Sequence, residues 1–215
     1  MPDTARDPSL PKRLLLTERD ALMPHLRAAP PESFDLPTCL PGWSVRDVLA
    51  HCAAAFTMTA TRTWHGFSPA ENQGDVDQRR DWPIGRLLDE LETGYATTAE
   101  AAASAGGRLD GLALGEWVHG GDVRSALGLP GAYASEGSED ALVLLAERTR
   151  QDGHRVPLTT VHLTDGRTLT VGTAAPEATL EADVATLIRI CTGRQSAPGT
   201  HRLTGAEPAA YCVFD

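Results

Sequence analysis

Two segments of the chain carry the residues whose types and spacing could do chemistry. The segment 41–51, PGWSVRDVLAH, combines a turn, a helix start and a histidine, His51, on the predicted helix. The segment 115–124, GEWVHGGDVR, places His119 three residues after Glu116. Residues three or four apart share one face of an α-helix, so Glu116 and His119 can point to the same side. If the two helices face each other, we expect His51, Glu116 and His119 to hold one divalent metal, with zinc as the first candidate.

Such a metal site would be catalytic rather than structural. Three protein ligands leave coordination positions open for water or for a substrate atom. Two further carboxylates lie near the histidines, because Asp47 precedes His51 by four residues and Asp122 follows His119 by three. Both are candidate general acids or bases, although Asp47 also has the spacing from Ser44 that is typical of a helix-capping box.

Each of these side chains also has an ordinary structural explanation. A single histidine on a helix is more often a partly buried, hydrogen-bonded residue than a ligand, and helical glutamates are mostly solvated. Trp43 fits the wall of a core or pocket better than a stacking platform, and we keep it as a candidate cofactor contact. Five histidines have no partner at ligand spacing and stay unassigned: His25, His65, His154, His162 and His201. The four cysteines form no C-x-x-C pair and are predicted to be free thiols: Cys39, Cys52, Cys191 and Cys212.

Hydrophobic periodicity predicts the helices that must position these residues. They span about 10–29, 45–64, 83–105 and 112–127. Proline or glycine pairs and Gly128 follow three of them, as is typical of helix ends. The polar segment 68–82 is expected to be a loop with an irregular or short helical piece. Four such helices favour an up-down bundle with one long crossover.

The pattern changes after Pro130. A linker is predicted over 131–137, a helix over 139–151, and two strands joined by an Asp-Gly turn over 161–172. A strand at 178–180, a helix over 182–191 and a last short strand at 211–214 complete the prediction. Helices first and strands later indicate an α+β protein, with a four-helix bundle over 1–130 and a small α+β domain over 138–215.

Charge and hydropathy exclude several classes of partner. The formal net charge is −10, with no dense stripe of basic residues, which argues against binding nucleic acid. The first residues lack the apolar core of a signal peptide, and no apolar run reaches the length of a membrane span. We expect a cytoplasmic protein that contacts no membrane. Its expected partners are a small-molecule substrate and, as an open option, a second copy of the chain in a homodimer.

The segments 41–51 and 118–128 resemble the two signature segments of the mycothiol-dependent maleylpyruvate isomerase family. Members have a DinB-like four-helix bundle that binds a divalent metal, followed by a small domain similar to sterol carrier protein. Segments 163–172, 187–194 and 203–205 resemble that second domain. The resemblance covers nearly the whole chain and implies the same two-domain fold.

The resemblance also implies metal ligands and a cofactor. His51 and His119 correspond to the two metal histidines of the family, whereas the family's glutamate position is Gly115 here and Glu116 is one residue later. A two-histidine site completed by water, a site that uses Asp122, and a bundle without metal therefore stay open beside the three-ligand site.

The implied chemistry is that of a thiol. In the family the metal lowers the pKa of the mycothiol thiol, and the thiolate attacks an electrophilic carbon of the substrate. The chain would then be a mycothiol-using isomerase or thiol transferase, with Arg194 holding a carboxylate of substrate or cofactor. Two alternatives remain: an accessory protein that binds a small molecule, and a metal-independent cyclase or isomerase.

Overall fold

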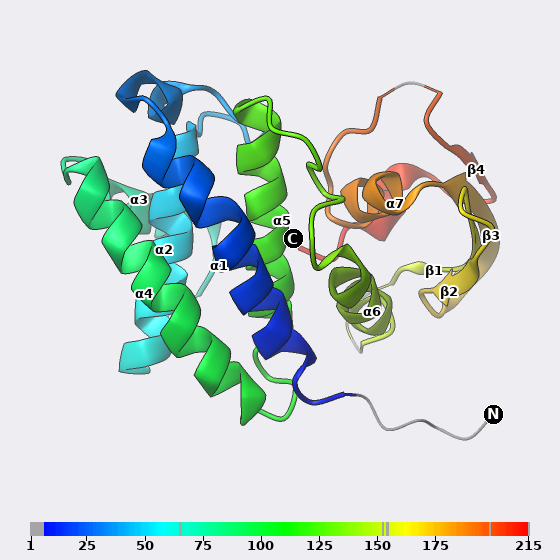
Figure 1. The fold of residues 1–215 in the computed structure, drawn as a ribbon. Coiled ribbons are helices and arrows are strands. Elements are labelled where there is room, and N and C mark those ends of the chain that lie inside the picture. The colour runs from blue at the N-terminus through cyan, green and yellow to red at the C-terminus, as the bar shows by residue number, and fades with distance from the viewer. Residues whose placement is uncertain (1–6, 65, 152, 154, 198, 215) are drawn as a thin grey trace. The chain divides into compact units, whose positions relative to one another are not determined.

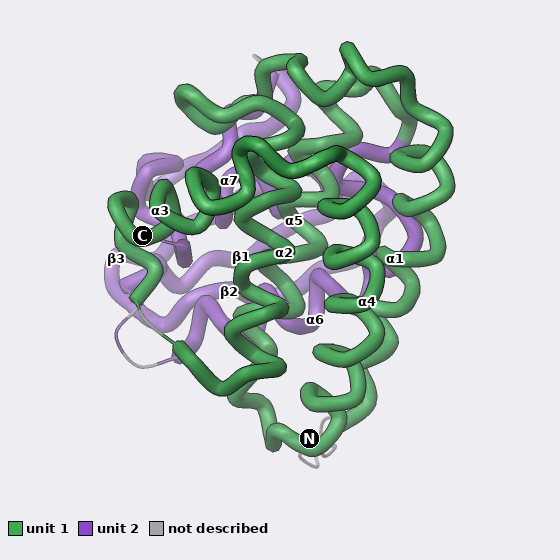
Figure 2. The backbone as a smooth tube through the Cα atoms, turned by 90° about the vertical axis from the view of Figure 1, so that its left-hand side faces the viewer, with its two compact units in different colours: residues 1–130 green, residues 131–215 purple. Residues whose placement is uncertain are grey.

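The computed structural model describes residues 7–64, 66–151, 153, 155–197 and 199–214. The chain divides into unit 1, Met1–Pro130, and unit 2, Gly131–Asp215 (Figure 2). Unit 1 is helical and unit 2 combines helices with a β-sheet, so the predicted α+β class is confirmed. In the part of the chain that the structure describes, no helix is both long and apolar enough to span a bilayer.

Unit 1 is a bundle of long helices: α1 (Leu10–Ala28), α2 (Val45–Thr61), α4 (Ile84–Ala103) and α5 (Asp110–Ala126). Both α1 and α2 contact α4 and α5, so α1 and α2 occupy opposite corners of the bundle (Figure 1). The 3-10 helix η1 (Pro31–Asp35) and helix α3 (Pro69–Arg79) contact α2. This arrangement packs α2 beside α5, the two helices that carry the candidate histidines.

The start of α2 is fixed by a capping box, as the sequence predicted. The Ser44 hydroxyl accepts a hydrogen bond from the backbone N–H of Asp47 at 3.3 Å. In return, the Asp47 carboxylate accepts one from the backbone N–H of Ser44 at 2.8 Å. Both N–H groups would otherwise lack partners at the helix end, so this exchange fixes where the helix begins.

The segment 68–82, expected as a loop with an irregular or short helical piece, forms the regular helix α3 over most of its length. A second capping box, between Ser68 and Glu71, begins the helix, and Pro69 occupies its first turn. Proline is well suited to that place because its fixed φ is helical and its missing N–H would be unpaired there anyway. The helix then runs for 11 residues, although few of them are apolar, because its contact with α2 supplies the support that its own sequence lacks.

A buried ion pair joins α1 to α5 inside the bundle. The Glu18 carboxylate accepts a hydrogen bond from the Arg124 guanidinium, and both side chains are buried. Burial raises the pKa of Glu18 to about 7, although the neighbouring Arg124 opposes the shift. Gly120 makes room for this pair, because a Cβ atom there would overlap the Glu18 carboxylate.

Unit 2 is built on a mixed sheet. The described residues give the strand order β2-β1-β3-β4, in which β1 pairs antiparallel with β2 and parallel with β3, and β4 pairs antiparallel with β3. Two helices lie on one side of the sheet (Figure 1). The bounds are α6 (Ser138–Arg148), β1 (Pro157–Leu163), β2 (Thr168–Val171), β3 (Ala174–Ala182), α7 (Val184–Cys191) and β4 (Arg202–Thr204).

The predicted hairpin over 161–172 is confirmed. His162 lies opposite Thr168 in the β1–β2 ladder. The Leu163 N–H donates to the Arg167 carbonyl at 2.8 Å and closes the turn. Gly166 adopts a φ of 91° there, a conformation that glycine reaches without steric cost and that explains the Asp-Gly signal.

The last predicted strand, at 211–214, was wrong. The chain forms a 3-10 helix, η2 (Pro208–Tyr211), and the fourth strand lies earlier, at Arg202–Thr204. Pro208 has no N–H for a strand ladder and favours a helical turn. The Tyr211 hydroxyl then lies 2.6 Å from the Thr159 hydroxyl in the buried interior of unit 2, so this segment anchors a side chain rather than adding a strand.

Helices α2 and α4 approach closely at Gly94, which generates a stability prediction. A Cβ atom at Gly94 would lie 2.6 Å from Phe56 Cβ, so Gly94→Ala should destabilise the protein by about 1–3 kcal/mol through overpacking. The control is Gly74→Ala in α3, where a Cβ atom meets nothing within 4 Å. That substitution should stabilise by about 0.5–1 kcal/mol, since alanine favours a helix over glycine. Thermal unfolding of both variants checks the pair, and an unchanged midpoint for Gly94→Ala would contradict the close approach.

Candidate active site

The two candidate histidines meet between α2 and α5. The ring centroids of His51 and His119 lie 5.2 Å apart, with the planes nearly perpendicular. His51 is only 8% exposed, and its Nδ1 atom has no hydrogen-bond partner among the described residues. Burial, and then the proximity of His119, lower the pKa of His51 to about 3. His51 is therefore a neutral imidazole at physiological pH, with a nitrogen lone pair available to a cation.

Aromatic side chains surround His51. Its ring centroid lies 5.2 Å from that of Trp43, which precedes α2, and 6.5 Å from that of Phe67, which precedes α3. The ring centroids of Phe67 and Trp64 lie 5.6 Å apart. This apolar wall explains the desolvation of the imidazole. Phe67 has no spacing relation to the histidine motifs, and no signal in the sequence singled it out.

His119 is oriented by Asp122. Its Nδ1 atom lies 3.0 Å from Oδ2 of Asp122, one helical turn further along α5. Asp122 is fully buried, so its contacts are formed in a medium that screens them weakly. A carboxylate at Nδ1 fixes the ring orientation and leaves Nε2 as the nitrogen that would meet a substrate or a cation.

Cys39 contacts the same carboxylate. Its thiol donates to Oδ1 of Asp122 across 3.1 Å, from an exposed position in the loop before α2. The sequence predicted a free thiol, which is correct, since Cys39 forms no disulfide. The contact with Asp122 was missed because 83 residues separate the two partners and no short motif joins them.

The Glu116 carboxyl group faces Cys52, the neighbour of His51 on α2. Its carboxyl group is buried and accepts a hydrogen bond from the Cys52 thiol, while its Oε2 atom has no partner among the described residues. Burial raises its pKa to about 8, against the smaller opposing effect of Cys52. One residue corresponds to about 100° of helix rotation, so the step from Gly115 to Glu116 turns the carboxyl group toward the core. Within the described ranges, no three His, Cys, Asp or Glu side chains form a group that could hold a metal.

The other predicted site residues have separate locations. The Asp47 carboxylate is engaged in the capping box of α2. Trp43 contacts His51 and donates from its indole nitrogen to Gln73 at 3.1 Å. Arg194 belongs to unit 2, where its guanidinium donates to the Thr192 carbonyl at 2.7 Å.

Among the described residues, the histidines that the sequence left unassigned join no group of three or more His, Cys, Asp or Glu side chains that could hold a metal. His162 is exposed on β1 and lies 3.2 Å from the Thr168 hydroxyl. His65 and His154 lie outside the described residues.

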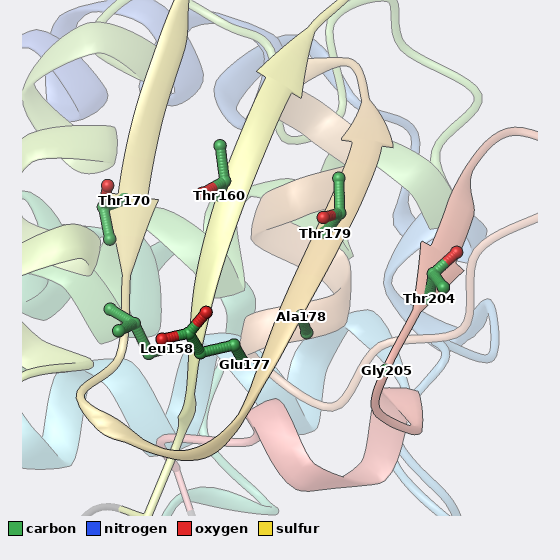
Figure 3. A pocket seen from close by; sticks show the side chains of 8 residues that line it. All are labelled: Leu158, Thr160, Thr170, Glu177, Ala178, Thr179, Thr204 and Gly205. Atoms are coloured by element: carbon green, nitrogen blue, oxygen red, sulfur yellow. The ribbon is translucent and has the colours of Figure 1, made fainter.

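Unit 2 has a hollow of about 510 Å³ on the sheet face opposite its buried side (Figure 3). One threonine from each strand crosses this face in register: Thr170, Thr160, Thr179 and Thr204. Glu177 is the one titratable side chain among the residues that line it. No histidine, cysteine or lysine among the described residues lines this hollow, so the imidazole pair of unit 1 is the better candidate for chemistry.

Glu116 generates a pH-dependent prediction. Its pKa is raised from 4.5 in the unfolded chain to about 8 in the fold, so the fold favours the neutral form. This contribution to stability is complete below pH 4.5 and is lost as the pH rises through about 8. Glutamine is neutral at every pH, so Glu116→Gln should gain stability relative to the unmodified chain across this interval.

Urea unfolding at several pH values measures the free energy of unfolding of both proteins. The titration of His51 affects both alike, so it cancels in the difference between them. Glu32→Gln, at an exposed position of η1, serves as the control. Parallel pH profiles for Glu116→Gln and the unmodified chain would contradict a buried, protonated Glu116.

Comparison with known proteins agrees with this description. The family model for the mycothiol maleylpyruvate isomerase N-terminal domain matches residues 15–136. The crystal structure of the mycothiol-dependent maleylpyruvate isomerase has a TM-score of 0.64 and 14% identity, covering 94% of this chain and 95% of that chain. A mutant of that isomerase with a histidine replaced by alanine gives the same TM-score and coverage at 16% identity. At such identities the likeness shows a shared fold, and a sequence comparison with curated proteins finds no match. Because the family model covers more than half of the 215 residues, the chain belongs to the mycothiol maleylpyruvate isomerase family.

Proposed function

We propose that this protein is an enzyme that uses mycothiol to isomerise a small electrophilic substrate or to transfer the thiol to it. The observation that carries the proposal is the pair of imidazoles from α2 and α5, 5.2 Å apart, with the buried Asp122 carboxylate behind one of them. Family membership supports mycothiol as the thiol. An electrophile that reacts with a thiol needs a nearby group that takes the thiol proton, and the His119 imidazole, with the Asp122 carboxylate at its Nδ1 atom, is suited to that task.

The donor set supports a divalent cation at the imidazole pair, with zinc as the first candidate. His51 offers a buried, unprotonated ring whose Nδ1 atom lacks a partner among the described residues. His119 has the histidine–carboxylate arrangement that commonly supports metal-ligating imidazoles. When bound, the cation would lower the pKa of the mycothiol thiol, so that the thiolate forms at neutral pH. Glu116 is less suited as a third ligand than the sequence suggested, because its carboxyl group contacts Cys52 in the core.

The surroundings of the pair supply the other requirements of the reaction. Trp43 and Phe67 cover His51 with apolar surface, which limits water access and strengthens electrostatic interactions. Asp122 holds the His119 ring so that Nε2 faces the reacting groups. Separately, Arg194 of unit 2 stays our proposal for a residue that binds a carboxylate of the substrate or of mycothiol, argued from its forked set of donors alone.

A metal-independent isomerase is the second candidate. The location of Glu116 favours it, since the described residues contain no three-ligand group. In that case the His119–Asp122 pair would move a proton on the substrate, with the carboxylate stabilising the charged imidazole.

Turnover experiments test the proposed thiol chemistry. With maleylpyruvate as the first substrate to try, the rate should depend on added mycothiol. His51→Ala and His119→Ala should each lower kcat/KM by about 100-fold or more, because each removes a group that acts on the thiol or the substrate. His162→Ala is the matched control, an exposed histidine of unit 2 that should leave the rate unchanged. Equal rates with and without mycothiol for this substrate and for other thiol-reactive electrophiles would reject the proposal.

Metal analysis separates the two candidates. Elemental analysis of the purified protein should find a stoichiometric divalent metal that is lost in His51→Ala and in His119→Ala. Glu116→Gln should keep the metal, because its carboxyl group contacts Cys52 instead of the imidazole pair. Metal-free protein with full activity would favour the metal-independent isomerase.

A further inference from the structure

We propose that Cys39 is a positioning residue that fixes the orientation of His119 through Asp122. Its effect on catalysis rests on the proposed function, whereas its effect on the His119 ring does not. The chain of contacts is short: the Cys39 thiol to Asp122 Oδ1 at 3.1 Å, and Asp122 Oδ2 to His119 Nδ1 at 3.0 Å.

The loop that carries Cys39 is closed by its own hydrogen bonds. The Thr38 N–H donates to the Trp43 carbonyl at 3.0 Å, and the Trp43 N–H donates to the Leu40 carbonyl at 3.1 Å. The Thr38 hydroxyl also donates to the Trp43 carbonyl, at 2.9 Å. Gly42 has a φ of 80°, which few other residues adopt at low cost, so the sequence itself favours this turn. Cys39 is thus presented by an ordered loop, although its side chain is exposed.

The same loop contacts both histidine-bearing helices. Trp43 packs on the His51 ring from α2, and Cys39 reaches Asp122 on α5. One segment therefore contacts the His51 ring directly and the His119 ring through Asp122. A change in this loop can then alter the distance and the angle between the two imidazole rings.

Each oxygen atom of Asp122 has a described contact, with the Cys39 thiol at Oδ1 and with His119 at Oδ2. A fully buried carboxylate has lost its water shell, so the loss of one donor raises the free energy of the fold or turns the group toward its other partners. Rotation of the carboxylate to replace a lost thiol donor would weaken the contact at Oδ2 and release the His119 ring. The thiol thus acts on the imidazole through the carboxylate, without contacting substrate.

Two variants of Cys39 separate this role from simple packing. Cys39→Ser keeps a donor of similar size, and Cys39→Ala removes it. The side-chain NMR signals of His119 should shift in Cys39→Ala and stay near their original positions in Cys39→Ser. Cys212→Ala, which changes a partly exposed thiol of unit 2, is the control and should leave these signals unchanged. This measurement does not require turnover, so it remains informative if the proposed function fails.

A double-mutant cycle tests the route through Asp122. Cys39→Ala should lower kcat by about 10-fold with little change in KM, in the range measured for residues that support a ligating histidine. Cys39→Ser should restore most of kcat. In an Asp122→Asn background, Cys39→Ala should have no further effect, because the group through which it acts is already altered.

Two outcomes would overturn the proposal. One is a His119 signal that is the same in Cys39→Ala as in the unmodified protein. The other is a loss of kcat in Cys39→Ala that persists undiminished in the Asp122→Asn background, which would mean that Cys39 acts by another route.

Discussion

The packing of α2 against α5 brings two polar rings together in a place where water is largely excluded. His51 and His119 lie 5.2 Å apart, and the Asp122 carboxylate beside them is fully buried. Removing any one of these groups from water alone would cost free energy. Their contacts offset part of this desolvation cost, because the carboxylate accepts a hydrogen bond from Cys39 and lies against His119. His51 stays neutral among aromatic rings, which also lowers the cost of its burial. The chemistry proposed for this family member depends on this shared arrangement.

Polar groups are also buried in the core of the bundle, and there they are neutralised in two different ways. Glu18 faces a permanent opposite charge on Arg124. Glu116 has a neutral partner, Cys52, and its raised pKa of about 8 favours the protonated acid. Glycines lie where α1 meets α5, beside Glu18, and where α2 meets α4, beside Phe56, because a Cβ atom at either place would overlap these side chains.

Much of the fold follows from local signals that act over a few residues. Apolar periodicity predicted the long helices, the Ser44–Asp47 spacing predicted a cap, and the Asp-Gly turn predicted the β1–β2 hairpin. Helix α3 is longer than the short helical piece that was expected, and strand β4 was missed, because their own sequences are polar or short, and contacts with α2 and β3 stabilise them. Single-sequence patterns carry little information on such tertiary support.

In the candidate site, too, local spacing predicted some features, and others depend on the packing of distant segments. Helical spacing indicated that His51 and His119 could share a site, and the structure brings their rings together. Spacing could not decide whether Glu116 joins them, since a residue three before His119 can turn either toward the ligand face or toward the core. Cys39 and Phe67 come from loops, and their approach to the site depends on how distant segments pack.

The outer strands of the sheet in unit 2 have a consequence for self-association. The edge strands β2 and β4 are only four and three residues long, and each pairs on its inner side with a longer strand. An edge of this length offers few unpaired backbone groups to a strand from another molecule. The unit can therefore leave one broad, threonine-bearing face of its sheet exposed while offering little template for intermolecular β-sheet growth.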